Sequence, residues 1–284
     1  MVRRYVHSEP TSRLAIWARR MAGFALAAAF LAVIIVQSGL LEIQPALATF
    51  GGALVIAAIA LLLAIAAFVA IWLEGLGGMG AALTAMLVSL ALLAYPAYLG
   101  MKAYRLPWIY DVTTDPIDPP RYEALARVRP RDANPVAYAG LYAAEQQRTA
   151  YPDIGPLSVT AAPQATYDAA LAIVNKRRWR VVEARTPQPG RREGRIEAVA
   201  RTPIMGFRDD VVMRVRPEGS DGSRIDVRSS SRYGQFDFGA NASRIRSLLD
   251  DVEEAITAQK AVRQPTPPTG KKAGPPPGKK DKKS

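Results

Sequence analysis

Three long apolar runs without a charged residue dominate the first part of this chain, at residues 21–36, 46–73 and 75–101. A helix rises about 1.5 Å per residue and needs roughly 20 apolar residues to cross the hydrocarbon core of a bilayer. The second and third runs reach that length unaided, and the first reaches it with the apolar residues that flank it. The sequence therefore predicts three transmembrane helices, with the lipid bilayer as their partner.

The formal net charge of +12 would suggest a nucleic-acid partner if the basic residues were gathered on one surface. They lie mostly at the two ends of the chain instead: residues 1–20 hold five arginines against Glu9, and residues 261–284 hold seven basic residues against Asp281. Between residues 105 and 260, acidic and basic side chains interleave. A phosphate-binding surface would lack these acids, so we expect no nucleic-acid partner.

The arginines ahead of the first apolar run predict how the helices cross the membrane. Arginine and lysine in short flanking segments are retained on the cytoplasmic side, so the N-terminus is expected there. Three spans then leave all residues after 101 on the other side, which places that region in the periplasm and the anchor in a bacterial inner membrane. The alternative is a cleaved signal peptide, indicated by Arg19, Arg20 and the segment Ala46-Leu47-Ala48. Cleavage would leave two spans and the same final location.

Cysteine is absent from the chain, and its one histidine is His7, in the segment ahead of the helices. Disulfides and thiolate chemistry are therefore excluded. The large region after residue 101 has no imidazole for a catalytic triad, for a general base near neutral pH or for zinc.

Composition divides the chain into five parts. A basic lead at 1–20 and the three-helix transmembrane region at 21–104 precede the segment 105–156, in which proline recurs and long helices are disfavoured. We expect that segment to be extended and, because it is rich in aromatic residues, to pack on the domain that follows. Residues 157–260 are predicted to form an α+β domain, and the Pro-, Gly- and Lys-rich residues 261–284 a disordered tail.

Periodicity within the domain predicts a membrane-anchored α+β fold, in which an antiparallel sheet is packed by two helices. Helices are expected from Pro163 and from about Asn241. Alternate residues in the later strands are apolar, such as Val211, Met213 and Val215, and the residues between them are mostly charged. One face of the sheet should therefore form the core under the helices, and the other should face water or a ligand. The predicted strands are 157–161, 179–184, 195–201, 210–216 and 224–230, with a hairpin loop at 217–223.

A spaced polar pattern runs through the second half of this domain. It consists of Gly206, Phe207, Asp209, Asp210, Val211, Arg214, Asp226, Val227, Arg228, Ser229, Ser231, Arg232, Gly234, Asp237, Gly239, Asn241, Ala242, Arg244 and Ile245. The pattern resembles the family catalogued as domain of unknown function 1499. Upstream, Thr114-Asp115, Pro119-Pro120 and Tyr151-Pro152 also fit that family, so the resemblance covers roughly residues 108–257. It implies a shared fold and brings no settled activity.

The polar residues of this pattern form the candidate site. They are Arg208, Asp209, Asp210, Arg214, Asp226, Arg228, Ser229, Ser231, Arg232, Asp237, Asn241 and Arg244. If the last two strands pair symmetrically, Arg214 faces Asp226 and Asp210 faces Ser230 across neighbouring strands. Such pairs favour a structural ion-pair network, which commonly has the same residue mix as a binding site.

The residues at the start of the last helix fit either a structural role or a binding site. Asp237 or Asn241 is expected to cap that helix, and Arg244, one turn later, to bind Asp237. In the functional alternative, a small anionic ligand is held partly by the helix N-terminus. The arginines around it would be those at 208, 228, 232 and 244.

The sequence leaves two hypotheses for the function of the protein. The favoured one is a non-catalytic envelope protein whose periplasmic domain binds a partner protein or a small anionic envelope component. The alternative is a cell-wall- or lipid-modifying enzyme that uses Asp209 or Asp210 with Asp226 or Asp237 as general acid and base. Asp209 and Asp210 point to opposite faces of a strand, so they cannot act together. We assign no catalytic residue and expect no cofactor, and too many arginines separate these acids for a metal such as Ca²⁺.

Overall fold

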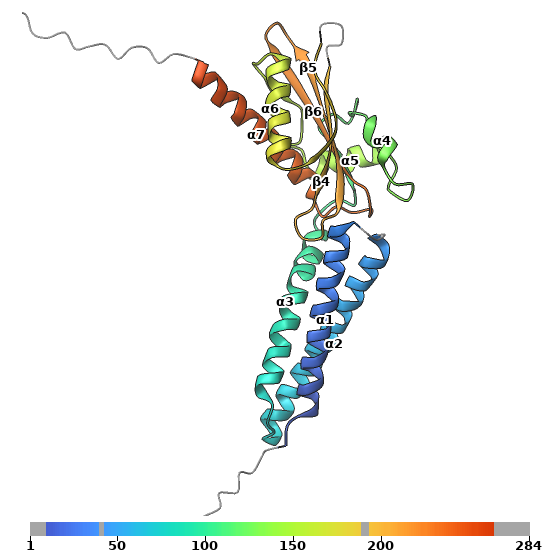
Figure 1. The fold of residues 1–284 in the computed structure, drawn as a ribbon, viewed down its shortest axis with the longest axis vertical. Coiled ribbons are helices and arrows are strands. Elements are labelled where there is room, and N and C mark those ends of the chain that lie inside the picture. The colour runs from blue at the N-terminus through green and yellow to red at the C-terminus, as the bar shows by residue number, and fades with distance from the viewer. Residues whose placement is uncertain (1–9, 40–42, 189–192, 264–284) are drawn as a thin grey trace, which may run out of the picture.

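The computed structural model describes residues 10–39, 43–188 and 193–263, with a helix bundle at one end and an α+β domain at the other (Figure 1). Residues 1–9 of the predicted basic lead lie outside the described residues, as does the predicted disordered tail from residue 264 onward. The domain is an antiparallel sheet with helices packed on it. The predicted fold class, a membrane-anchored α+β protein, is therefore confirmed.

The bundle consists of α1 (Arg13–Ser38), α2 (Ile43–Glu74) and α3 (Met79–Ala103), which are, within the described residues, the helices long and apolar enough to cross a membrane. Their buried faces are built from small side chains, which let the backbones approach closely. Large side chains such as Phe30 and Leu62 point outward and are 67% and 68% exposed. The predicted transmembrane helices are confirmed and associate the protein with a membrane. In α1 the buried alanines are Ala15, Ala18, Ala22, Ala25, Ala29 and Ala32.

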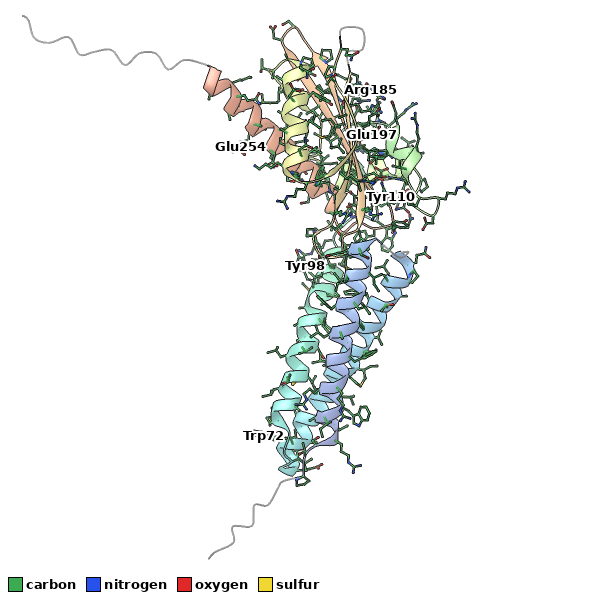
Figure 2. All side chains as sticks on the ribbon, in the orientation of Figure 1. Trp72, Tyr98, Tyr110, Arg185, Glu197 and Glu254 are labelled. Carbon is green, nitrogen blue, oxygen red and sulfur yellow. The ribbon has the colours of Figure 1, made fainter. Side chains whose placement is uncertain are left out.

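α1 and α3 run toward the domain and α2 runs back, so the start of α1 lies at the end of the bundle away from the domain (Figure 1). Exposed aromatic side chains mark both ends: Trp72 lies at the far end and Tyr98 near the domain (Figure 2). Trp and Tyr gather at the two membrane–water interfaces of spanning helices. The positions of these residues therefore agree with a bundle that crosses the bilayer.

The sheet has the strand order β1-β6-β5-β4-β3, and β2 pairs with β6 on the same edge as β1. Its strands are β1 (Asp111–Thr113), β2 (Leu157–Val159), β3 (Arg180–Arg185), β4 (Gly194–Arg201), β5 (Arg208–Glu218) and β6 (Gly222–Ser231). All these pairs are antiparallel. The pairing of β5 with β6 continues to Glu218 and Gly222, so the loop expected at 217–223 is shorter than predicted.

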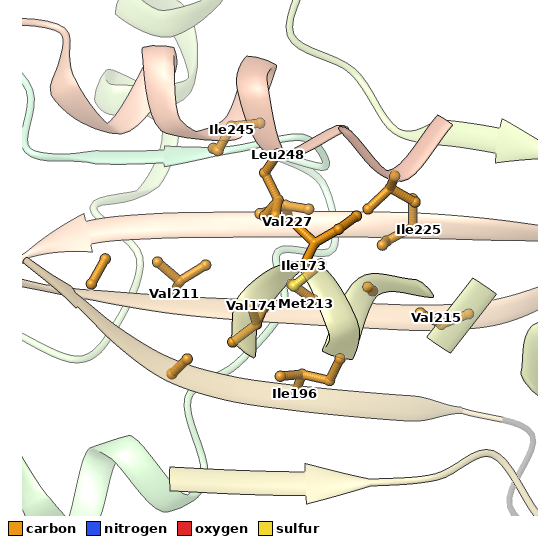
Figure 3. Packing of buried hydrophobic residues seen from close by; sticks show 14 of the residues in the cluster. Ile173, Val174, Ile196, Val211, Met213, Val215, Ile225, Val227, Ile245 and Leu248 are labelled. Carbon is orange, nitrogen blue, oxygen red and sulfur yellow. The ribbon is translucent and has the colours of Figure 1, made fainter. Parts of the chain in front are cut away.

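α6 (Pro163–Lys176) and α7 (Ala240–Arg263) cover one face of the sheet, which we call the inner face (Figure 3). Val211, Met213 and Val215 of β5 lie beneath these helices and are at most 1% exposed. Full burial of such a side chain contributes about 1.5–3 kcal/mol. The apolar alternation therefore forms the core as predicted.

Two short helices, α4 (Ala124–Val128) and α5 (Gly140–Ala150), interrupt the segment 105–156, which was expected to be extended. Proline is absent between Pro135 and Pro152, and that window is long enough for α5. The same segment contributes β1 to the edge of the sheet. The expected extended conformation is therefore wrong for these residues.

The part of this segment that contains α4 packs on the outer face of the sheet, opposite α6 and α7 (Figure 1), whereas Ile109, Ala143 and Tyr151 join the core beneath those helices. Tyr122 and Leu125, which are 5% and 0% exposed, contact Val199 and Val212 of β4 and β5. The face that was expected to meet water or a ligand is thus covered by the protein's own chain.

The loop between β4 and β5 rests on the end of α1. Gln37 Nε2 donates a hydrogen bond to the Ile204 carbonyl oxygen at 2.7 Å. Gly206 lies against Gln37 with a φ of 69°, a left-handed conformation that glycine adopts without steric cost. This contact positions the domain on the bundle.

Candidate functional site

Arg228 of β6 is buried beneath the segment that covers the outer face. Its Nη2 donates to Asp111 Oδ2 at 2.6 Å and its Nε to Asp111 Oδ1 at 3.0 Å, and both side chains are at most 2% exposed. Further N–H groups donate to the carbonyl oxygens of Pro120 and Val136, and the guanidinium lies 4.6 Å from the centroid of the Tyr122 ring. All these partners belong to the segment 105–156, so Arg228 fastens that segment to the sheet.

Asp210 holds two buried arginines on the same face. Arg129 Nε donates to Asp210 Oδ2 at 2.7 Å, and Arg232 Nε donates to Oδ1 at 2.9 Å. Arg129 Nη2 also donates to the hydroxyl of Ser230, the residue opposite Asp210 in the ladder, as predicted. Both oxygens of this fully buried carboxylate therefore accept from a guanidinium.

Asp226 gathers three more arginines. Arg214, which lies opposite Asp226 as predicted, donates from Nη2 to Asp226 Oδ2 at 3.0 Å. Arg216 Nη2 donates to the same oxygen at 2.9 Å, and Arg224 Nε donates to Oδ1 at 2.9 Å. Arg214 also reaches Asp118 of the covering segment at 2.9 Å.

Several members of this outer network were missed in the sequence, among them Glu197, Asp111 and Arg129. The fully buried Glu197 carboxylate accepts the backbone N–H groups of Glu123 at 2.8 Å and Leu125 at 2.7 Å, and so caps α4 from the sheet. The charged alternation of β4 was an available signal for Glu197. Asp111 and Arg129 had none, because no periodic pattern surrounds them.

A second network joins β5 and β6 to α7, at the end of the sheet nearest the bundle. Arg244 Nη2 donates to Asp209 Oδ2 at 2.5 Å, and its Nη1 donates to Ser229 Oγ at 2.9 Å. Asn241 Nδ2 donates to Ser231 Oγ at 3.0 Å. Burial raises the pKa of Asp209, and the Arg244 cation opposes that shift. These candidate residues thus come together as hydrogen-bond partners of one another.

Asp237 caps α7, as predicted. Its Oδ1 accepts the Gly239 N–H at 2.7 Å and its Oδ2 accepts the Asn241 N–H at 2.9 Å. Burial raises the pKa of Asp237, and these N–H groups oppose the rise. The expected pair between Arg244 and Asp237 does not form, because Arg244 reaches Asp209 on β5 instead.

Arg208, at the start of β5, differs from the other candidate arginines, because it has no carboxylate partner among the described residues. Burial lowers the pKa of Arg208, and the nearby cations of Arg201, Arg232 and Arg180 lower it further. Its guanidinium lies against Gly39, which ends α1. The carboxyl end of a helix favours a cation. Arg208 thus brings positive charge to the junction between bundle and domain.

A cleft of about 660 Å³ lies at this junction, and we call it the junction cleft. Its bundle side is formed by Leu47 of α2 and by Tyr95, Leu99 and Lys102 of α3. Its domain side comprises the end of β4 and the start of β5 with their loop, the loop after β6 and the first turns of α7. One wall of the cleft is thus mostly apolar, and Arg201 and Arg208 belong to the wall that faces it.

A smaller hollow of about 370 Å³ lies beside the junction cleft and shares Arg201 and Arg208 with it. The arginines that line this hollow are Arg177, Arg178, Arg180, Arg201 and Arg208. Arg177 is paired with Asp251 at 2.7 Å. In the part of the chain that the structure describes, the other four have no carboxylate partner. The two hollows therefore share a surface of uncompensated positive charge.

Asp209 and Asp237 also line the junction cleft, and they are the pair that a catalytic interpretation would use. Their oxygens are already engaged, that of Asp209 by Arg244 and those of Asp237 by backbone N–H groups. The other candidate acids, Asp210 and Asp226, lie on the opposite face under the covering segment.

A model of the family described as Protein of unknown function (DUF1499) matches residues 111–252. The match begins at β1 and ends within α7, so it contains both polar networks, and the three apolar helices precede it. It agrees with the resemblance seen in the polar pattern. A search of curated proteins gives no match.

Proposed function

The chain belongs to the DUF1499 family of proteins of unknown function, and we propose that it is a non-catalytic membrane protein whose α+β domain binds a small anionic component of the bacterial envelope. The binding site is the junction cleft. In this proposal the bundle sits in the inner membrane and the domain projects into the periplasm. The arginines ahead of the first apolar run, at residues 1–20, support that orientation, because such residues are retained in the cytoplasm.

The observation that carries the proposal is the group of uncompensated cations at the cleft and in the smaller hollow beside it. Arg180, Arg201 and Arg208 lie close enough for two of them to depress the pKa of the third, and no carboxylate among the described residues pairs with them. Arg208 is partly buried beside the exposed Arg180 and Arg201; like charges held together repel, and a bound anion relieves that repulsion. Guanidinium groups also match phosphate and carboxylate oxygens in geometry. A protein partner, the other ligand expected from the sequence, lacks comparable support.

The non-catalytic part of the proposal is supported by the way the acidic residues are used. Asp210 and Asp226 are covered and neutralised by arginines. Their contacts hold strands and segments together, which is the usual role of a buried ion-pair network.

One observation favours a second candidate, an enzyme that uses two carboxylates. Asp209 and Asp237 both line the junction cleft, and burial raises the pKa of each, as in general acids. In that case Asp237→Asn would abolish turnover of an envelope substrate and leave anion binding intact. We rank this candidate second because every oxygen of Asp237 already accepts a backbone N–H group.

The proposal is tested by calorimetric titration of the full chain, in an uncharged detergent, with inorganic pyrophosphate. We expect binding in wild type and a loss of at least about tenfold in affinity in Arg201→Gln/Arg208→Gln, because each charged hydrogen bond contributes about 1.5–3 kcal/mol. The matched control is Arg121→Gln/Arg148→Gln, which removes two exposed charges away from the cleft. Absence of binding in wild type, or equal binding in both double variants, would contradict the proposal.

A further inference from the structure

We propose that the ligand of the junction cleft is a membrane lipid with an anionic phosphate headgroup, an inference that rests on the proposed function. The headgroup binds Arg201 and Arg208, and the acyl chains lie along the apolar wall made by α2 and α3. A free phosphate offers the same headgroup chemistry, so the apolar wall is what distinguishes the two ligands.

The apolar wall comes from helices that span the membrane. Leu47 and Tyr95 are 39% and 45% exposed, and Leu99 lies one turn beyond Tyr95 on α3. Since these side chains belong to apolar helices, an acyl chain can pass from the bilayer to the cleft while it stays in apolar surroundings. A soluble anion has no apolar part that could contact this wall.

Lys102 stands where this wall meets the polar wall, in the last turn of α3. Lysine near the end of a spanning helix reaches the headgroup level with its ammonium group while its stem stays in apolar surroundings. It therefore places a further cation at the depth where a lipid phosphate lies.

The domain side of the cleft is amphipathic as well. Phe236 lines the cleft, stacks on Trp108 with ring centroids 5.2 Å apart and meets Phe238 edge-on at 4.5 Å. Trp108 follows the end of α3 by five residues and is 66% exposed. Aromatic side chains of this kind settle at the headgroup level of a bilayer. The cleft therefore joins an aromatic interface belt to a cationic surface, which matches a lipid with an anionic head.

The size of the junction cleft fits part of a lipid. Its volume of about 660 Å³ lies in the range of about 300–1,000 Å³ that is typical of small-molecule sites. That space accommodates a phosphate headgroup and the first carbons of the chains, and the remainder of the chains stays in the bilayer.

The inference is tested by native mass spectrometry of the full chain in uncharged detergent, titrated with dioleoyl-phosphatidylglycerol or with zwitterionic dioleoyl-phosphatidylcholine. We expect one bound phosphatidylglycerol with at least about tenfold preference over phosphatidylcholine. Arg201→Gln/Arg208→Gln should lose this preference. Leu99→Trp, which fills the apolar wall, should weaken lipid binding and leave pyrophosphate binding unchanged. The matched control is Leu87→Trp, at a position on α3 that is 70% exposed and away from the cleft.

The outcomes separate this inference from the proposed function. If pyrophosphate binds but phosphatidylglycerol shows no preference, or if Leu99→Trp binds lipid as Leu87→Trp does, the lipid inference is overturned and the anion site stands. If neither pyrophosphate nor phosphatidylglycerol binds, both are wrong.

Discussion

Arg228 is the largest of the fully buried side chains among the described residues, and it forms an ion pair with the carboxylate of Asp111. Removing a guanidinium and a carboxylate from water is costly, and the pair offsets that cost only with good geometry and further hydrogen bonds. Both conditions hold here, since the carbonyl oxygens of Pro120 and Val136 accept two further N–H groups of Arg228. At the scale of single residues, buried ion pairs therefore hold the outer face together with the apolar contacts of Tyr122 and Leu125.

Arg228→Ala would leave the Asp111 carboxylate buried without its partner, so we expect the free energy of unfolding to fall by about 3–5 kcal/mol. Arg232→Ala should also lower the free energy of unfolding, because Arg232 is 2% exposed and binds Asp210, but by less, since Arg129 still pairs with that carboxylate. Arg208→Ala should leave the melting temperature unchanged or raise it, because neighbouring cations repel Arg208. Thermal unfolding of the full chain in mild detergent measures all three. Equal midpoints for the three variants would contradict the network.

Asp237 provides a pH-dependent prediction. Burial raises the pKa of Asp237 in the folded protein. Folding therefore favours its protonated form, so its contribution to stability is complete below the unfolded-state pKa of about 3.9 and is lost as the pH rises through the folded-state value. Asp237→Asn stays neutral throughout. The melting temperature of wild type relative to this variant should rise between about pH 7 and about pH 4. A fall would mean that the N–H groups outweigh burial.

At the scale of elements, β5 and β6 could be predicted because their alternation is long, and it even places Arg214 opposite Asp226. α6 and α7 could be predicted from their apolar periodicity. β1, α4 and α5 could not, because they are short and their partners are distant in sequence. The N–H of Leu125 in α4, for instance, is capped by Glu197, 72 residues away.

The candidate site, too, could be predicted only in part from the sequence. The spaced polar pattern contains both partners of some ion pairs, such as Arg214 with Asp226, but Arg228 and Asp210 also bind partners in the segment 105–156. The junction cleft could not be predicted at all. It requires the ends of α2 and α3 beside the β4–β5 loop, and no periodicity in the sequence encodes that contact.

The segment 105–156 contributes an edge strand, part of the core and the cover of the outer face, which predicts how the domain tolerates truncation. A polypeptide of residues 108–258 should fold without the bundle, because its strands and helices supply a core of their own. A polypeptide of residues 157–258 should not fold, because its buried arginines would lose Asp111 and the covering segment. Circular dichroism and thermal unfolding check both. A cooperative transition in the shorter polypeptide would contradict the structural role of the segment.

At the scale of the whole molecule, the start of α1 and the domain lie at opposite ends of the bundle (Figure 1). The arginines of the N-terminal segment predict that the domain end is periplasmic. Alkaline phosphatase fused after Leu106 or Ala258 should therefore be active in a bacterial host, and a green fluorescent protein at the same positions should be dark. The opposite pair of results would reverse the orientation and remove the periplasmic envelope component as ligand.

The central claim is that the junction cleft holds an anion at the membrane surface. The most direct measurement is an experimental structure of the full chain in nanodiscs that contain phosphatidylglycerol. The account predicts density for a phosphate group within hydrogen-bond distance of Arg201 and Arg208, with acyl density beside Leu47 and Leu99. A cleft without that density, in which the Arg208 guanidinium is instead paired with a carboxylate of the protein, would contradict it.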